Sequence, residues 1–227
     1  PERQQWLRYV HETLRLIRRG PLEKLVLAQQ MNVRFDRPLE TDFLCASLDS
    51  AARNTHRFML ETEDGTSFLG ASPETLIRRR GTTVDTESLA GTIESGDTSR
   101  ENQDLARELA DNPKNQREHD FVLNTIRDRL EPHVESITTG DQTVRRFPSV
   151  QHLYTPIEGN LVEDTHVLTL AETLHPTPAV GGTPADVYEE YRREFEPFER
   201  GWYASPIGWF DRGGHGHFAV GIRSALV

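Results

Sequence analysis

Lysine is almost absent from the basic residues of this chain, so each lysine that remains is a candidate for chemistry that arginine cannot perform. Lys24 and Lys114 are the two lysines among 26 lysines and arginines in a chain of 227 residues. Arginine stays protonated, with a pKa above about 12, whereas burial can lower the pKa of a lysine until it accepts a proton. Lys24 lies in the apolar run 22–27, which favours burial and a role as a base. The alternative is a lysine at a strand end, whose stem covers apolar surface while its ammonium reaches solvent.

Four further segments combine glycine or proline with polar groups, a pattern that holds a side chain or a backbone N–H in a fixed place. The turn 70–74, Gly-Ala-Ser-Pro-Glu, puts the carboxylate of Glu74 directly after a strand. The segment 89–92, Leu-Ala-Gly-Thr, is small enough to let the backbone approach a ligand. The segment 175–182, His-Pro-Thr-Pro-Ala-Val-Gly-Gly, offers one histidine and several backbone donors in one loop. The last strands contain Tyr203 and Arg223, and an arginine between apolar residues is costly to bury unless it meets a carboxylate.

Each of these features also has a purely structural interpretation. Glu74 could cap a turn, His175 could be a loop histidine with its hydrogen bonds satisfied, and Arg223 could pair with one of the 36 acidic residues. Glu118 and His119 do not form a zinc motif, because no second histidine follows at the required spacing. A phosphate-binding loop, a dinucleotide-binding glycine pattern after a strand and a nucleophile elbow are missing as well.

Composition excludes several classes of partner. The formal net charge of −10 and the pI of about 5.4 argue against nucleic acid and anionic membranes. Cys45 is the single cysteine, which rules out an intrachain disulfide and fits a reducing interior. We see no signal peptide and no apolar run near the ~20 residues that span a bilayer, so we expect a cytoplasmic location. The acidic excess with few lysines resembles proteins from a high-salt cytoplasm.

The pattern of elements predicts an α+β fold with largely antiparallel sheets and flanking helices. Hairpins and helices are mixed without a regular βαβ alternation. We expect one domain over residues 1–227, long enough to bury a sizeable core. The predicted helices cover 2–19, 41–52, 100–110, 115–134, 167–173 and 184–195. The predicted extended regions cover 22–35, 56–89 and 144–162, and a closing hairpin pairs 203–211 with 217–227.

Taken together and in this order, the segments resemble the chorismate-utilising enzymes, the family of isochorismate, salicylate, anthranilate and aminodeoxychorismate synthases. The resemblance runs from about Lys24 to Arg223 and implies the fold of that family with chorismate as the substrate. Six motifs carry it: Lys24-Leu-Val-Leu-Ala, Gly70 to Glu74, Leu89 to Thr92, Pro113-Lys114 with Glu118-His119, His175 to Gly182, and Tyr203-Ala to Arg223.

The resemblance implies one Mg²⁺ ion and a set of residues around the substrate. Glu118 resembles the metal ligand of the family, and carboxylate oxygens are the ligands that Mg²⁺ prefers. Tyr203 and Arg223 resemble the residues that grip the enolpyruvyl carboxylate, a task that suits a planar guanidinium. The remaining expected substrate contacts come from the two glycine-containing segments, at Gly91, Thr92, His175, Thr177, Ala179 and Gly181 with its neighbour Gly182.

Within the family, the residue at position 24 separates the reactions. Members that add water to the ring carry a lysine there, and the aminodeoxychorismate enzymes carry a nucleophilic lysine at the position of Ala90. Lys24 with Ala90 therefore resembles the isochorismate and salicylate branch, with Lys24 activating water for attack at C2 and Glu74 protonating the departing C4 hydroxyl. We expect an isochorismate synthase for menaquinone or siderophore synthesis, acting as a monomer without a glutaminase partner. A salicylate synthase and a non-catalytic chorismate-binding module are the alternatives.

Some positions depart from the family pattern. Gln29 stands where relatives often have arginine, Asn115 where some have a second acidic residue, and Ser205 where a glycine is common. The family also continues past the strand of Arg223 into a glycine loop and a helix that supply another Mg²⁺ carboxylate and a lysine for the substrate. We expect this chain to lack those residues and the N-terminal region of the family, and so to hold an incomplete site.

Overall fold

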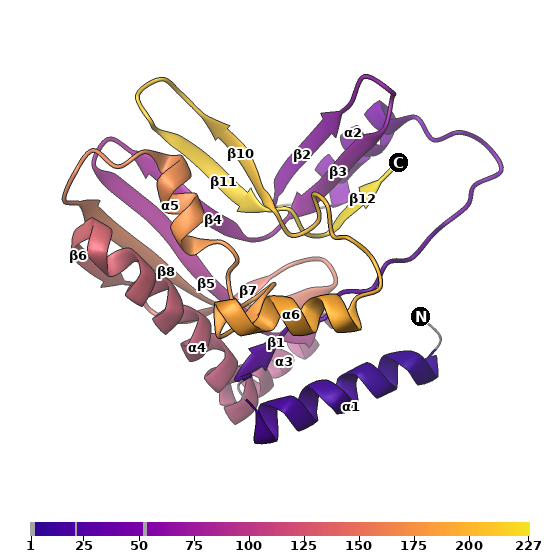
Figure 1. The fold of residues 1–227 in the computed structure, drawn as a ribbon, viewed down its shortest axis with the longest axis horizontal. Helices are drawn as coiled ribbons and strands as arrows, with labels where there is room; N and C mark the ends of the chain where they lie inside the picture. The colour runs from indigo at the N-terminus through magenta and orange to yellow at the C-terminus, as the bar shows by residue number, and fades with distance from the viewer. Residues whose placement is uncertain (1–2, 21, 52–53) are drawn as a thin grey trace.

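A seven-stranded antiparallel sheet forms the centre of the molecule (Figure 1). The computed structural model describes residues 3–20, 22–51 and 54–227. The strand order is β10-β11-β4-β5-β8-β6, and β7 also pairs with β8. The strands are β4 (Thr75–Arg80), β5 (Thr83–Glu94), β6 (Val134–Thr139), β7 (Thr143–Arg146), β8 (Val150–Leu161), β10 (Pro206–Phe210) and β11 (Gly216–Val220).

The two long strands β5 and β8 give the sheet its frame. They pair from Thr83↔Asn160 to Glu94↔Val150, and the register shifts once, between Ala90 and Thr92. Gly91 lies in this bulge with φ +75°, a backbone conformation that a side chain would strain. The bulge therefore explains why glycine stands inside an otherwise regular strand.

Two smaller sheets complete the strand content. One has the order β12-β3-β2, and Figure 1 shows it splayed away from the β10–β11 hairpin. The other is the short pair β1-β9, in which Lys24 lies opposite Thr183 and Leu25 opposite Gly182. This pair ties the beginning of the chain to the loop 175–182. The strands are β1 (Lys24–Leu25), β2 (His56–Glu61), β3 (Ser67–Ser72), β9 (Gly182–Thr183) and β12 (Ser224–Leu226).

Helices α4 and α5 pack against the central sheet and form the main hydrophobic core with it (Figure 1). Val122 and Ile126 of α4 and Leu170 of α5 are at most 3% exposed, and each such buried side chain contributes about 1.5–3 kcal/mol. Helix α1 contacts α6 through Tyr9 and Phe195, whose ring centroids are 5.7 Å apart. The helices are α1 (Arg3–Arg19), α2 (Thr41–Ala51), α3 (Ser99–Asp111), α4 (Pro113–Leu130), α5 (Val167–Leu174) and α6 (Ala185–Phe195), with a 3₁₀ turn at Glu131–His133.

The start of α4 is set by local hydrogen bonds. Asn112 caps the helix, because its side-chain oxygen accepts from the backbone N–H groups of Lys114 and Asn115. Pro113 follows at the first helical position, where its missing N–H costs nothing. The cap fixes where the helix begins and therefore which side chains of its first two turns face the sheet.

The fold class is confirmed, and the predicted helices are all present, but two predicted strands are wrong. The strand expected over 22–35 is reduced to Lys24–Leu25, because after this pair the backbone at Val26 and Ala28 also bonds to side chains, those of Arg200 and Glu196. The strand expected over 217–227 is broken, since β11 ends at Val220 and β12 joins a different sheet. The long helix stops at Leu130, where Pro132 follows in a 3₁₀ turn, so Val134 begins β6. Glu2 and Ala52, included in predicted helices, lie outside the described residues.

Within the described ranges, every helix is too short or too polar to serve as a membrane span.

Candidate active site

Lys24 lies beside the carboxylate of Glu118, at the point where β1 approaches α4. Its Nζ is 3.5 Å from Glu118 Oε1, and the Lys24 side chain is 17% exposed. Burial lowers the pKa of Lys24, while the neighbouring Glu118 carboxylate opposes that shift. The predicted base and the predicted metal ligand therefore occupy one site, and the base is largely shielded from water.

Glu74 lies in the tight turn between β3 and β4 and is 5% exposed. Its Oε1 accepts a 3.0 Å hydrogen bond from the hydroxyl of Thr177. Burial raises the pKa of Glu74 to about 7, against the effect of the Thr177 hydrogen bond; the charge of Glu87 adds to the rise and that of Lys24 opposes it. A carboxyl group in this state can be protonated near neutral pH and can act as an acid.

Three sets of hydrogen bonds hold the loop 175–182. The ring of His175 donates from Nε2 to the carbonyl of Ala204 at 2.8 Å. Arg129 donates to the carbonyls on either side of His175, those of Leu174 and Pro176, at 2.8 Å each. The carbonyl of Thr177 accepts from the N–H groups of Val180 and Gly181, at 3.1 and 2.9 Å. The imidazole of His175 thus supports the loop, and Ala179 packs against the hydrophobic core.

His119 anchors the helix that carries Glu118. The imidazole is fully buried, and its Nε2 lies 2.8 Å from the hydroxyl of Thr155 on β8. Ser88 of β5 donates to the backbone carbonyl of His119 at 3.2 Å. A Cβ added to Gly91 would lie 3.2 Å from the side chain of Asn115, so the bulge also lets α4 approach the sheet closely. These contacts fix the orientation from which Glu118 reaches Lys24.

His152 is a site residue that the motifs did not reveal. Its Nδ1 lies 2.9 Å from the hydroxyl of Thr92 and 3.3 Å from the carbonyl of Gly91. Its Nε2 accepts from a guanidinium nitrogen of Arg223 at 3.2 Å. Burial lowers the pKa of His152 to about 4, and the charge of Arg223 adds to the effect, so the ring is neutral at pH 7. His152 therefore connects two predicted substrate segments that are far apart in the sequence.

Among the described residues, Arg223 does not form the ion pair with an acidic side chain that its purely structural interpretation suggested. The residue is exposed, lies between β11 and β12 with φ +52°, and contacts His152 instead. Its guanidinium carbon is 5.9 Å from the ring centre of Phe147. Tyr203 is half-buried against the hydrophobic core, and in the described part of the chain no hydrogen bond joins it to Arg223. The structure therefore does not pair these two residues directly.

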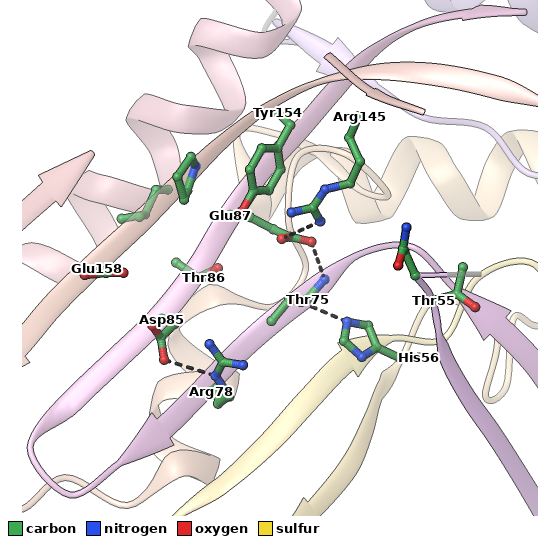
Figure 2. A pocket seen from close by; sticks show the side chains of 13 residues that line it. Thr55, His56, Thr75, Arg78, Asp85, Thr86, Glu87, Arg145, Tyr154 and Glu158 are labelled. Atoms are coloured by element: carbon green, nitrogen blue, oxygen red, sulfur yellow. Dashed lines mark hydrogen bonds and ion pairs between the residues drawn. The ribbon is translucent and has the colours of Figure 1, made fainter. Parts of the chain in front are cut away.

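A polar hollow of about 620 Å³ is lined in part by Thr75, the residue after Glu74, and Figure 2 shows the hydrogen bonds among its lining residues. Glu87 accepts from a guanidinium nitrogen of Arg145 at 3.0 Å and from the backbone N–H of Thr75 at 2.9 Å. The hydroxyl of Thr75 lies 2.9 Å from Nε2 of His56. Because Thr75 directly follows Glu74, these contacts hold the backbone of the turn. The hollow itself contains neither Lys24 nor Glu118.

Glu118 is the carboxylate that could hold a metal at this site. Among the residues that the structure describes, no three aspartate, glutamate, histidine or cysteine side chains come close enough together to share an ion. Mg²⁺ commonly takes one or two protein carboxylates and fills its other positions with substrate oxygens and water. Glu118, half-exposed at the mouth of the site, fits such a partial ligand set.

Comparison with known proteins agrees with the six motifs. A family model described as "Chorismate binding enzyme" matches residues 1–227. The chain belongs to the chorismate-binding enzymes. Isochorismate synthase MenF of Bacillus subtilis is 38% identical over 227 residues, which is all of this chain and 48% of the relative. The salicylate biosynthesis isochorismate synthase of Pseudomonas aeruginosa is 39% identical over 230 residues, which is all of this chain and 47% of that protein.

A solved isochorismate synthase shares the fold of this chain. The menaquinone-specific isochorismate synthase MenF from Escherichia coli superimposes with a TM-score of 0.93 and 31% sequence identity, over all of this chain and 53% of its own. The chain spans about half the length of the curated relatives it matches. The predicted family is confirmed, while the roles of individual site residues stay predictions.

Proposed function

We propose that the protein is an isochorismate synthase, which converts chorismate to isochorismate by adding water at C2 with loss of the C4 hydroxyl. The observation that supports this most strongly is the convergence of two ionisable groups of opposite type, a buried carboxyl at Glu74 and a largely shielded amine at Lys24. Lys24 and Glu74 come from β1 and from the β3–β4 turn, and each lies within electrostatic reach of the other. A reaction that adds one oxygen and expels another needs one base and one acid, and this pair supplies both.

The proton transfers balance across the two groups. Neutral Lys24 takes a proton from water as its oxygen bonds to C2, the ring double bonds shift, and the C4–oxygen bond breaks. Glu74 gives its proton to the departing hydroxyl, which leaves as water. General acid or base catalysis contributes about 10²–10⁴-fold for each positioned group. Lys24 then carries the extra proton and Glu74 the negative charge, so return of one proton restores the enzyme.

The charged groups at the rim of the site suit a dicarboxylate. Arg223 presents an exposed guanidinium held by His152, and we assign it to the enolpyruvyl carboxylate of chorismate. Glu118 would hold a Mg²⁺ ion, which would neutralise the ring carboxylate when bound. The backbone at Gly91 and the loop 175–182 would enclose the ring. Since the nucleophile is water, no glutaminase subunit is needed to deliver ammonia, and we expect the enzyme to act as a monomer.

Product analysis tests the proposal. The full-length protein is incubated with chorismate and Mg²⁺, and the products are separated by chromatography. We expect isochorismate without stoichiometric release of pyruvate. Salicylate and pyruvate in equal amounts would identify a salicylate synthase, and ammonia-dependent anthranilate would contradict the assigned nucleophile. Calorimetry beside the turnover assay covers the remaining case, because tight chorismate binding without any product would indicate a non-catalytic module.

A further inference from the structure

Thr177 belongs to the loop expected to contact the substrate, yet its hydroxyl is directed at Glu74. The Oγ1–Oε1 distance is 3.0 Å, and both residues are buried, Thr177 at 3% and Glu74 at 5% exposure. Within the described residues, this is the one hydrogen bond that a side chain donates to the Glu74 carboxyl; the backbone N–H of Glu74 donates to Ser72 instead. Thr177 thus contacts one carboxyl oxygen, and the described part of the chain places no hydrogen-bond donor on the other.

The position of the Thr177 hydroxyl is rigid. Its own carbonyl accepts two backbone hydrogen bonds, from Val180 and Gly181, and the preceding residues are held by Arg129. A β-branched side chain has few rotamers to choose from, and burial restricts it further. The position of the Thr177 hydroxyl relative to the Glu74 carboxyl is therefore fixed by the loop.

The chemistry of a hydroxyl decides what this contact does. A threonine hydroxyl donates one proton, and Oε1 already accepts it. When Glu74 is protonated, the carbonyl oxygen of the carboxyl group is the better acceptor, so the contact favours Oε1 in that role and the proton on Oε2, from which it can be given to the departing hydroxyl of the substrate. The same hydrogen bond stabilises the ionised form of the carboxyl, which opposes the effect of burial and of Glu87 on its pKa. Without it the acid would hold its proton more tightly.

We propose that Thr177 is a positioning residue that acts through Glu74, selecting Oε2 as the oxygen that donates the proton, rather than a residue that contacts the substrate. This inference rests on the proposed role of Glu74 in the isochorismate synthase reaction. The charged groups that face Glu74 are Lys24 from β1 and Glu87 from β5, and Glu87 is itself paired with Arg145. Thr177 is neutral, so it can be replaced without altering the charges around Glu74.

Two variants separate the hydroxyl from the shape of the side chain. Thr177→Val removes the hydroxyl and keeps the branched form, whereas Thr177→Ser keeps the hydroxyl. In the full-length protein we expect Thr177→Val to lower kcat by about 10- to 100-fold, the range of a hydrogen bond to a charged group, with little change in KM. We expect its alkaline limb of kcat to move to higher pH, and Thr177→Ser to retain most of the activity with the parental pH profile.

A readout independent of turnover distinguishes failure of this inference from failure of the proposed function. Infrared difference spectroscopy follows the carboxyl band of Glu74 as pH is varied, with Glu74→Gln as the blank. We expect the titration to move upward in Thr177→Val and to stay in place in Thr177→Ser. If Thr177→Val does not fold, Thr177→Ala serves as the smaller hydroxyl-free variant. A raised KM with unchanged kcat, an equal loss in the serine variant, or an unmoved Glu74 titration would each overturn the inference.

Discussion

At the scale of single residues, Glu74 combines nearly complete burial with an ionisable carboxyl group, and this combination makes the stability of the protein depend on pH. Its folded-state pKa of about 7 lies above the ordinary value of 4.5. The folded protein therefore holds the proton more tightly than the unfolded chain does. The resulting stabilisation is complete below about pH 4.5 and is lost as pH rises through about 7.

Glu74→Gln should accordingly lower turnover but raise the stability of the folded protein above about pH 4.5. Glutamine cannot donate the proton, so kcat should fall by about 10²–10⁴-fold or more. The stability of the variant relative to the parent should rise between pH 4.5 and 7, because the variant buries no charge. Above that range the difference should level off at about 3 kcal/mol. Urea unfolding at several pH values measures this, with Glu108→Gln on the exposed face of α3 as the control. A constant stability difference across that range would contradict the assigned pKa.

A second prediction at this scale concerns the backbone and the guanidinium of Arg223. Its φ of +52° is a conformation that costs a non-glycine residue roughly 1 kcal/mol, while glycine adopts it freely. Arg223→Gly should therefore leave the free energy of unfolding almost unchanged and weaken chorismate binding by about 10-fold or more through loss of a charged hydrogen bond. Calorimetry and denaturation on the same preparation measure both. Loss of stability with unchanged chorismate affinity would assign Arg223 a structural role.

The motifs predicted Lys24 and Glu74 because each stands in a short segment of unusual composition, whereas Glu118 was predicted through the resemblance to the family. They did not reveal His152, because its contacts depend on the bulge at Gly91 and on the loop that carries Arg223. Both contacts arise from the pairing of distant strands, which no local pattern records. For the same reason the sequence placed Thr177 in the site but could not identify its partner.

At the scale of elements, a buried ion pair joins the segment after Lys24 to the loop 175–182. Glu196 is fully buried in its side chain and accepts from the backbone N–H of Ala28 at 2.7 Å and from Arg200 Nε at 2.8 Å. Arg200 donates in turn to the carbonyls of Val26, at 2.9 Å, and Val180, at 2.7 Å. These contacts replace the ladder hydrogen bonds that a longer strand at 22–35 would have formed. The apolar run alone therefore could not predict how that segment is held.

Removing one partner of this pair should be costly. Arg200→Ala would leave Arg192, at 3.3 Å, as the remaining guanidinium partner of the buried Glu196 carboxylate. We therefore expect a destabilisation of about 1.5–3 kcal/mol, the range of a hydrogen bond to a charged group. Arg193→Ala is the matched control, because its ion pair with Glu189 lies at the surface and should contribute less than about 1 kcal/mol. Denaturant unfolding of both variants measures the difference. Equal, small losses would show that the buried pair does not hold these segments together.

At the scale of the whole molecule, the sequence predicted the class of the fold but not its division into sheets. Alternating apolar residues and turn signals mark individual strands, whereas the choice of neighbour depends on the packing of the entire chain. The last strand illustrates this, because the chain leaves the central sheet at Gly221 and its next strand, β12, pairs with β3 (Figure 1). That crossing places Arg223 beside His152, so the topology itself assembles one side of the site.

The proposed reaction depends above all on Lys24 as the base that activates water, and replacement of Lys24 by arginine removes that base while keeping its charge. Lys24→Arg keeps the charge and roughly the length, but arginine cannot release a proton near neutral pH. We predict that kcat falls by about 10²–10⁴-fold while chorismate affinity changes little. Lys114→Arg, at the other lysine of the chain, exposed at the start of α4, should retain parental turnover. Turnover by Lys24→Arg near the parental rate, at the salt concentration where the parent is active, would contradict the assignment of the base and of the water-adding branch.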